Sequence, residues 1–257
     1  MAISSTDLIF YSSANPTTSD SGTSGGAVDR DMRVIFTDIS AADTVEILSS
    51  AAGDTTQTVT ITGRRADGVI VSDPLALNGT TVVTSTETFE RILKVVMSAD
   101  AVGVVTVRKQ SDNVTIGQIP VGERGFLRMF YDATAYASGS GSGTKLLYQK
   151  IFLCNVHTSL ALLNAVIELT SDPSSVVTFR LEDAVNDNNS SANRLTEPTG
   201  LDANSWDDTA KSVPGGYLGD ATTSTKDEIG VWVRLSLTEG LAPSEGSFVL
   251  TVTGSST

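Results

Sequence analysis

Hydrophobic and polar residues alternate with a period of two along much of this chain. A clear case is the run in which Val59 and Ile61 alternate with threonines. A period of two places successive side chains on opposite faces of a strand, so that one face is buried and the other meets water. Turn-forming residues separate such runs, as Ala-Asp-Gly at 66–68 and Asn-Gly at 78–79. The stretch 56–83 therefore predicts three short strands joined by two turns.

Similar runs recur on both sides of this stretch. Two of them, 89–97 and 160–169, have an apolar composition that also suits a helix, but the β-branched residues of the first and the turns that flank both favour strands. Many short strands separated by turns are typical of β-sandwiches, so the sequence predicts an all-β fold. The further expected strands are 32–37, 45–48, 102–107, 114–119, 126–131, 145–156, 176–181, 229–237 and 248–253.

Breaks in the pattern suggest how the chain is organised. Residues 12–28 are rich in Ser, Thr, Gly and Asn, a composition too polar to order itself, which predicts a flexible arm or a plain surface loop. Proline and glycines at 120–125 indicate a boundary, with the Gly/Ser run at 138–143 as the alternative linker. We expect two β-sandwich-like domains with long loops and a flexible N-terminal arm: arm 1–28, N-terminal β-domain 29–119 and C-terminal β-sandwich domain 120–257.

The charge balance narrows the classes of partner. The chain has 257 residues, with 17 Lys and Arg against 30 Asp and Glu, a formal net charge of -13. Nucleic-acid binding depends on a positive patch, and no cluster of basic residues interrupts the acidic excess, so we expect no nucleic-acid partner. No run has the length or apolar character of a membrane helix, and the first residues do not resemble a signal peptide. The single cysteine excludes an internal disulfide, so the sequence predicts synthesis in a cytoplasm. Because no run suits a membrane helix, we expect no membrane partner.

Catalytic chemistry finds little support in the residue types present. The single histidine, His157, lies three residues after Cys154, a spacing that places the two side chains on opposite faces of a strand. No nucleotide-binding or hydrolase motif is present. We therefore expect a protein that is not an enzyme, with no catalytic residue, cofactor or metal site. The Asp- and Asn-rich loop at 183–208 offers oxygen ligands without the spacing of an EF-hand, and calcium binding there stays open.

Aromatic and apolar side chains outside the regular pattern are candidates for interaction. One group is the apolar run that precedes the polar segment of the expected arm, which suits an arm that reaches a neighbouring subunit. The other consists of the two tryptophans, one in the long loop and one on a strand. The candidate interaction residues are Leu8, Ile9, Phe10, Tyr11, Trp206 and Trp232.

Several stretches resemble β-modules of structural proteins of tailed bacteriophages. In the first half these are Thr-Val-Thr-Ile-Thr-Gly at 58–63 and Leu-Ala-Leu-Asn-Gly-Thr-Thr-Val-Val at 75–83. In the second half, Tyr-Gln-Lys-Ile-Phe-Leu-Cys-Asn at 148–155 and Gly-Val-Trp-Val-Arg-Leu at 230–235 look like a companion module. The likeness covers most of residues 30–254 and brings no catalytic residues with it.

The resemblance implies a capsid decoration or cement protein on the outer surface of the virion. Its implied partner is the lattice of the major capsid protein, and the implied assembly is a homotrimer on threefold positions. An acidic, Ser/Thr-rich surface suits a protein that stays soluble before it assembles on a lattice through many weak contacts. The alternatives are a tail, head–tail connector or fibre-associated subunit and, from another class, a carbohydrate-binding module supported by Trp206. A polysaccharide depolymerase is a third class, which requires paired carboxylates in a groove.

Overall fold

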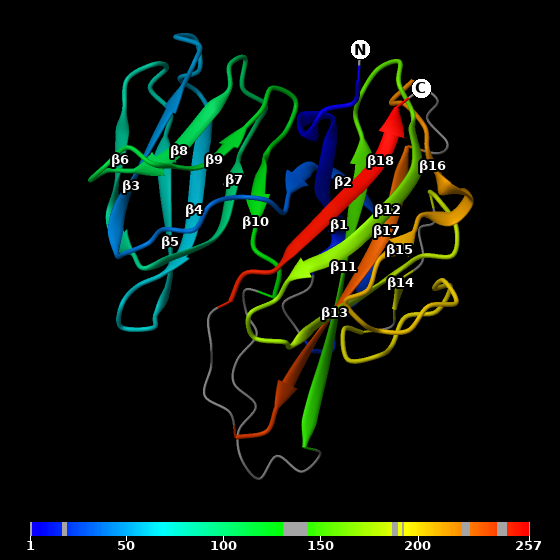
Figure 1. The fold of residues 1–257 in the computed structure, drawn as a ribbon. Coiled ribbons are helices and arrows are strands. Elements are labelled where there is room, and N and C mark those ends of the chain that lie inside the picture. The colour runs from blue at the N-terminus through cyan, green and yellow to red at the C-terminus, as the bar shows by residue number, and fades with distance from the viewer. Residues whose placement is uncertain are drawn as a thin grey trace. The chain divides into compact units, whose positions relative to one another are not determined.

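The computed structural model describes residues 2–16, 20–130, 143–186, 190–191, 193–222, 227–240 and 246–256 (Figure 1). Within these ranges the regular elements are strands and two short 3-10 turns, η1 (Ser5–Asp7) and η2 (Pro214–Gly216), with no α-helix. The expected all-β character is therefore confirmed. The two ambiguous runs form strands β7 (Arg91–Met97) and β12 (Leu162–Ser171). In the same described ranges, no helix is long and apolar enough to cross a membrane.

The chain divides into two compact units. Unit 2 is the continuous segment Arg30–Met129, whereas unit 1 combines Met1–Asp29 with Phe130–Thr257. This division differs from the expected one, because residues 120–125 lie within unit 2 and the expected arm 1–28 belongs to unit 1. The proline and glycines at 120–125 form a turn inside unit 2, where the Glu123 amide donates to the Pro120 carbonyl at 3.1 Å. Most of the Gly/Ser run at 138–143 lies outside the described residues.

Unit 2 is built from strands that are close neighbours in the sequence. One group has the order β2-β10-β7-β4-β5, to which β2 (Ser24–Arg33) contributes its last residues, and the other has the order β6-β3-β8-β9. Both groups contribute to one apolar core. All pairings are antiparallel except that of β10 with the last residues of β2. The strands are β3 (Asp43–Ser49), β4 (Thr58–Arg64), β5 (Ile70–Ala76), β6 (Val83–Phe89), β7, β8 (Val105–Lys109), β9 (Thr115–Ile119) and β10 (Gly125–Leu127).

The core of unit 2 follows from the period-two pattern. Val59 and Ile61 on β4 are fully buried, while the threonines between them are partly exposed. Where strands end, buried carboxylates replace the missing backbone partners. Asp54 accepts hydrogen bonds from the Ser49 hydroxyl at 2.5 Å and from the backbone amides of Val102 and Gly103 at 2.9 and 3.0 Å. These bonds fix two turns against each other and lower the pKa of Asp54.

Unit 1 brings together strands from both ends of the chain. A larger group has the order β13-β17-β11-β1-β2, with β14 paired to β2. In a smaller group, β12 pairs with β15, β16 and β18. The strands are β1 (Leu8–Asn15), β2 (Ser24–Arg33), β11 (Thr144–Asn155), β12, β13 (Val177–Leu181), β14 (Ser190–Ser191), β15 (Lys211–Ser212), β16 (Tyr217–Leu218), β17 (Glu228–Thr238) and β18 (Val249–Ser256).

The segment expected as a flexible arm, 1–28, contributes instead to the larger sheet of unit 1. Strand β1 lies between β11 and β2, and the consecutive residues 9–13 are all buried, so both of its faces are covered. Several serines of this segment are small enough to be buried in the strands. Ser12 and Ser24 are fully buried, and the Ser24 hydroxyl donates to the Tyr148 carbonyl at 3.0 Å. Average composition therefore gave the wrong expectation for this segment, because serine is compatible with a buried strand when a carbonyl accepts its proton.

Candidate functional site

The apolar run predicted as an interaction segment lies within strand β1. Ile9, Phe10 and Tyr11 are buried, and Leu8 is partly exposed. Leu8 is in register with Asn155 of β11. In this structure the surfaces of the three buried side chains are taken up by unit 1 itself, so they are not available to a partner.

Trp232 is also enclosed. It lies on β17, is 0% exposed, and its indole Nε1–H donates to Oε1 of Glu182 at 3.3 Å. Its cross-strand neighbours are Lys150 on β11 and Arg180 on β13. Trp232 therefore belongs to the interior of unit 1 and, as placed, presents no surface to a partner.

Trp206, like Leu8, is a predicted interaction residue that keeps some exposure to solvent. Its indole Nε1–H donates to Oε1 of Glu197 at 2.7 Å. The Tyr148 ring meets it edge-on, with centroids 5.2 Å apart. The guanidinium carbons of Arg234 and Arg180 lie 5.1 and 5.9 Å from its ring centroid. We call these five residues, Tyr148, Arg180, Glu197, Trp206 and Arg234, the Trp206 cluster.

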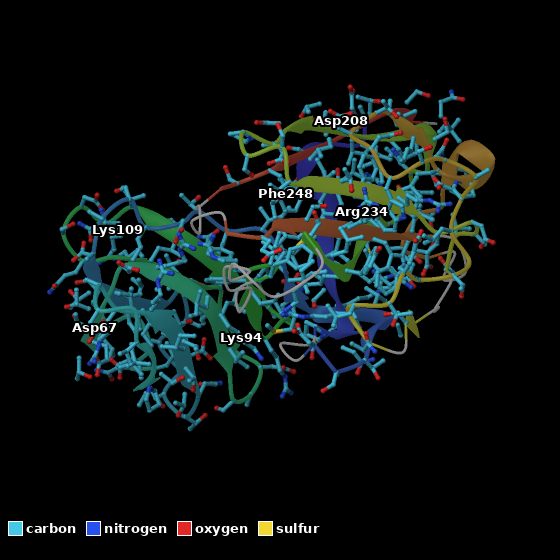
Figure 2. All side chains as sticks on the ribbon, turned by 90° about the horizontal axis from the view of Figure 1, so that it is seen from below. Asp67, Lys94, Lys109, Asp208, Arg234 and Phe248 are labelled. Carbon is cyan, nitrogen blue, oxygen red and sulfur yellow. The ribbon has the colours of Figure 1, made fainter. Side chains whose placement is uncertain are left out.

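The sheet positions Tyr148, Arg180 and Arg234 of the Trp206 cluster on one face. Tyr148 and Arg234 are directly opposite on β11 and β17, and Arg234 is opposite Thr178 on β13. The Arg234 Nε–H donates to the Thr178 hydroxyl at 3.0 Å, which fixes the guanidinium beside the ring. Figure 2 labels Arg234 on strand β17. Sequence reasoning missed Tyr148, Arg180 and Arg234, although polar residues in the middle of apolar strands were a signal that this face is covered.

Charges around the Trp206 cluster balance one another. Arg180 forms ion pairs with Asp202 at 3.3 Å and with Glu197 at 3.8 Å. Burial raises the pKa of the Tyr148 hydroxyl, and the nearby Glu197 carboxylate raises it further. The cluster thus holds the long loop against the sheet through two cations that face an aromatic ring. Such an arrangement suits attachment of a loop, because the ring and its N–H group are already engaged within the chain.

A second polar group is buried deeper on the same face. Lys150 and Glu182 are both 0% exposed, and the lysine Nζ is in direct contact with Oε1 of the glutamate. The same Nζ lies 4.6 Å from the centroid of the Phe152 ring and 5.9 Å from that of Trp232. Gly230 lies between the two side chains. We call Lys150, Phe152, Glu182, Gly230 and Trp232 the Lys150 network.

Two aspartates of the long loop form ion pairs with basic residues. Asp207 pairs with the buried Lys211 at 2.5 Å, which lowers the pKa of the Asp207 carboxyl to about 2. Asp202 is engaged by Arg180. Among the described residues, no group of three or more His, Cys, Asp and Glu side chains is arranged to hold a metal ion. Residues 187–189, which belong to the loop considered for calcium, lie outside the described part of the chain.

His157 closes a turn after β11. Its Nδ1 accepts hydrogen bonds from the backbone amides of Ser159 and Leu160 at 3.1 and 3.0 Å. Cys154 is buried within β11, in the small apolar cluster that includes Ile9 and Tyr11. The two residues therefore have separate roles in packing and in the turn.

Comparison with known proteins adds no family to this description. No protein-family model matches the chain, and no curated protein matches it significantly. A functional conclusion therefore depends on the residues and on their arrangement in the two units.

Proposed function

We propose that this chain is a non-enzymatic structural protein of a tailed-bacteriophage virion that binds and stabilises the outer surface of the capsid. The proposal includes the finer arrangement of two β-sandwich domains, assembly as a homotrimer, and the lattice of the major capsid protein as the partner. It rests on the resemblance of the strand motifs to phage β-modules. The same resemblance supports a location on the virion.

The observation that carries the proposal is how the motifs are used in the fold. The motif at 58–63 lies in β4, and the motif at 75–83 runs from the end of β5 to the start of β6. The motifs at 148–155 and 230–235 form the long paired strands β11 and β17 of unit 1. The residues that resemble phage modules are therefore framework residues, which favours a structural role for the whole chain.

Exposed apolar side chains offer the contact surface that lattice binding requires. Val102 is 76% exposed and Ile70 is 53% exposed in unit 2, and Val249 is 49% exposed in unit 1. They are scattered on an acidic chain that stays soluble by its charge. Many weak contacts of this kind add up as avidity on a symmetric lattice.

The direct test is to mix the purified protein with undecorated heads of the phage that encodes it and to count bound copies by electron microscopy. Regular density at local threefold or sixfold positions is the expected result. The variants Ile70→Asp and Val249→Asp then report which unit makes the contact, each serving as the control for the other. Bare shells at saturating protein would overturn the proposal.

The second virion role, as a tail, connector or fibre-associated subunit, predicts a different copy number. Such a subunit forms a ring or a short assembly at one place on the particle, whereas a decoration protein covers the shell with many copies. Labelled protein found at a single vertex or along the tail would select this role.

A carbohydrate-binding role rests on Trp206 and is less well supported by the geometry. Sugars stack on the open face of an aromatic ring, but the ring of Trp206 is in contact with Tyr148 and two arginines. Binding on a glycan array that disappears in Trp206→Ala would revive this role.

A further inference from the structure

We propose that Lys150 and Glu182 become joined by an internal amide bond between the lysine Nζ and the glutamate Cδ. Such an isopeptide bond would be a covalent modification of unit 1 that links strand β11 to the residue after strand β13. The inference is independent of the proposed function, because it concerns the chemistry of one buried pair.

The fold holds the side chains of Lys150 and Glu182 close together. Glu182 follows β13 and its backbone N–H donates to the Gly230 carbonyl at 3.0 Å, which fixes it across β17 from Lys150. A Cβ placed on Gly230 would lie 2.6 Å from Glu182 Cδ and 2.7 Å from Lys150 Cε. The two side chains therefore converge on the space that the glycine leaves empty. Groups held in contact in this way react as an intramolecular pair, with a large gain over reaction in solution.

The Lys150–Glu182 pair is removed from water. Both side chains are 0% exposed, and the aromatic rings of Phe152 and Trp232 face the lysine nitrogen. Removal from water disfavours the ionised forms of an amine and a carboxylate. The reaction requires a neutral amine beside a neutral acid, the form that results when the ammonium proton passes to the carboxylate.

Trp232 is placed to activate the carboxyl group of Glu182. The Trp232 indole N–H donates to Glu182 Oε1 at 3.3 Å. When the amine attacks Cδ, negative charge develops on the oxygen that remains, and a fixed donor stabilises that charge. The Trp232 side chain itself is held by burial on β17.

The atoms of the reaction balance without a cofactor or an oxidant. The Nζ–Cδ bond forms and the Cδ–Oε2 bond breaks. Two of the three ammonium protons leave with Oε2 as one water molecule, and the third stays on the amide nitrogen. A site that excludes water also protects the product from hydrolysis.

The bond would cross-link strands that do not pair with each other. Strand β17 lies between β11 and β13 in the sheet. A covalent bridge over β17 closes a loop of the chain between residues 150 and 182, which restricts the unfolded state as a disulfide does. The single cysteine of the chain cannot supply such a bridge by oxidation.

The deciding measurement is the intact mass of the purified full-length chain under denaturing conditions. The expected result is a mass about 18 Da below that of the sequence, corresponding to the loss of one water molecule. Tryptic digestion should yield one branched peptide that contains both Lys150 and Glu182, without cleavage after Lys150. The variants Lys150→Met and Glu182→Met should both have the full mass of their sequences.

An internal control is the pair Lys211–Asp207. It combines a buried lysine with a carboxylate in hydrogen-bond contact, but the aspartate side chain is 35% exposed. Peptides that contain Lys211 and Asp207 should be recovered unlinked. A wild-type chain of full mass after prolonged incubation in the folded state would overturn the proposal, whether or not the variants fold. A mass loss mapped to any other pair would also overturn it.

Discussion

The two units differ in what they bury. Unit 2 is closed by an apolar core whose members alternate along short neighbouring strands, with carboxylates such as Asp54 fixing the turns. Unit 1 buries a lysine, a glutamate and several serines inside its larger sheet, and a long loop is attached to the same face by Trp206. The comparison indicates that period-two alternation specifies the apolar core of unit 2, where buried polar groups such as Asp54 fix the turns, whereas unit 1 buries specific polar partners within its larger sheet.

The largest effect in this comparison is expected from a cavity in the core of unit 2. Ile61 is fully buried on β4, so Ile61→Ala should lower the free energy of unfolding by about 2–5 kcal/mol. Ile70→Ala on neighbouring β5, where the side chain is 53% exposed, is the matched control and should cost about 0.5 kcal/mol or less. Urea denaturation measures both. Equal costs for the two variants would contradict the assignment of Ile61 to the core.

The second effect tests the polar interior of unit 1. Gly230→Ala places a methyl group within 2.7 Å of atoms of Glu182 and Lys150, both of which are fully buried, so we expect a loss of about 1–3 kcal/mol. Gly53→Ala in unit 2 is the control, because nothing lies within 4 Å of its added Cβ. Denaturation midpoints of the two variants measure the difference. A stable Gly230→Ala chain would show that the Lys150 network is loosely packed.

The same contrast explains how much of the fold the sequence predicted. Most strands of unit 2 were predicted nearly within their bounds, because Val59 and Ile61 alternate with threonines and the turns contain glycine. The expected strand 32–37 was wrong in most of its length, since β2 ends at Arg33. The position of β1 was not predicted, since it depends on pairing with β11 and β2. Ser12 is buried in this strand, and its hydroxyl donates a hydrogen bond to a backbone carbonyl. Composition carries no information on such a bond.

The candidate site was predicted less well than the fold. Trp206 and Trp232 were singled out as aromatic residues. The environment of Trp206 depends on Arg180 of β13 and Arg234 of β17. The environment of Trp232 depends on Glu182, the residue after β13. One-dimensional alternation identifies the face of a side chain and not the residue opposite to it. Cross-strand register, which the structure supplies, is what brings these charges to the tryptophans.

A third effect, of about the same size as the second, is expected at the carboxylate that fixes the turns of unit 2. Asp54→Asn keeps the shape of the side chain but replaces one acceptor oxygen with a donor, opposite backbone amides that also donate. We expect a loss of about 1–3 kcal/mol, the cost of a buried polar group left without its hydrogen bond. Urea denaturation of Asp54→Asn and of the exposed control Asp67→Asn checks this. A loss as small as that of the control would contradict a structural role for Asp54.

The smallest effect is a pH dependence in unit 1. The pKa of Asp207 is lowered from 3.8 to about 2, first of all by the hydrogen bond from Lys211. A lowered pKa means that the folded state favours the ionised carboxylate. The contribution of Asp207 to stability is therefore complete above about pH 4 and is lost as the pH falls towards 2. Solvent reaches this carboxylate, so screening keeps the contribution modest.

The measurement is the difference in unfolding free energy between the wild type and Asp207→Asn at several pH values. The difference should be constant between about pH 5 and 7 and should shrink below about pH 4. Lys211→Met removes the largest cause of the pKa shift but leaves the hydrogen bonds from Thr209, so in that background the Asp207→Asn difference should depend less on acid pH. A difference that grows as the pH falls would have the opposite sign and would contradict the role of the Asp207–Lys211 pair.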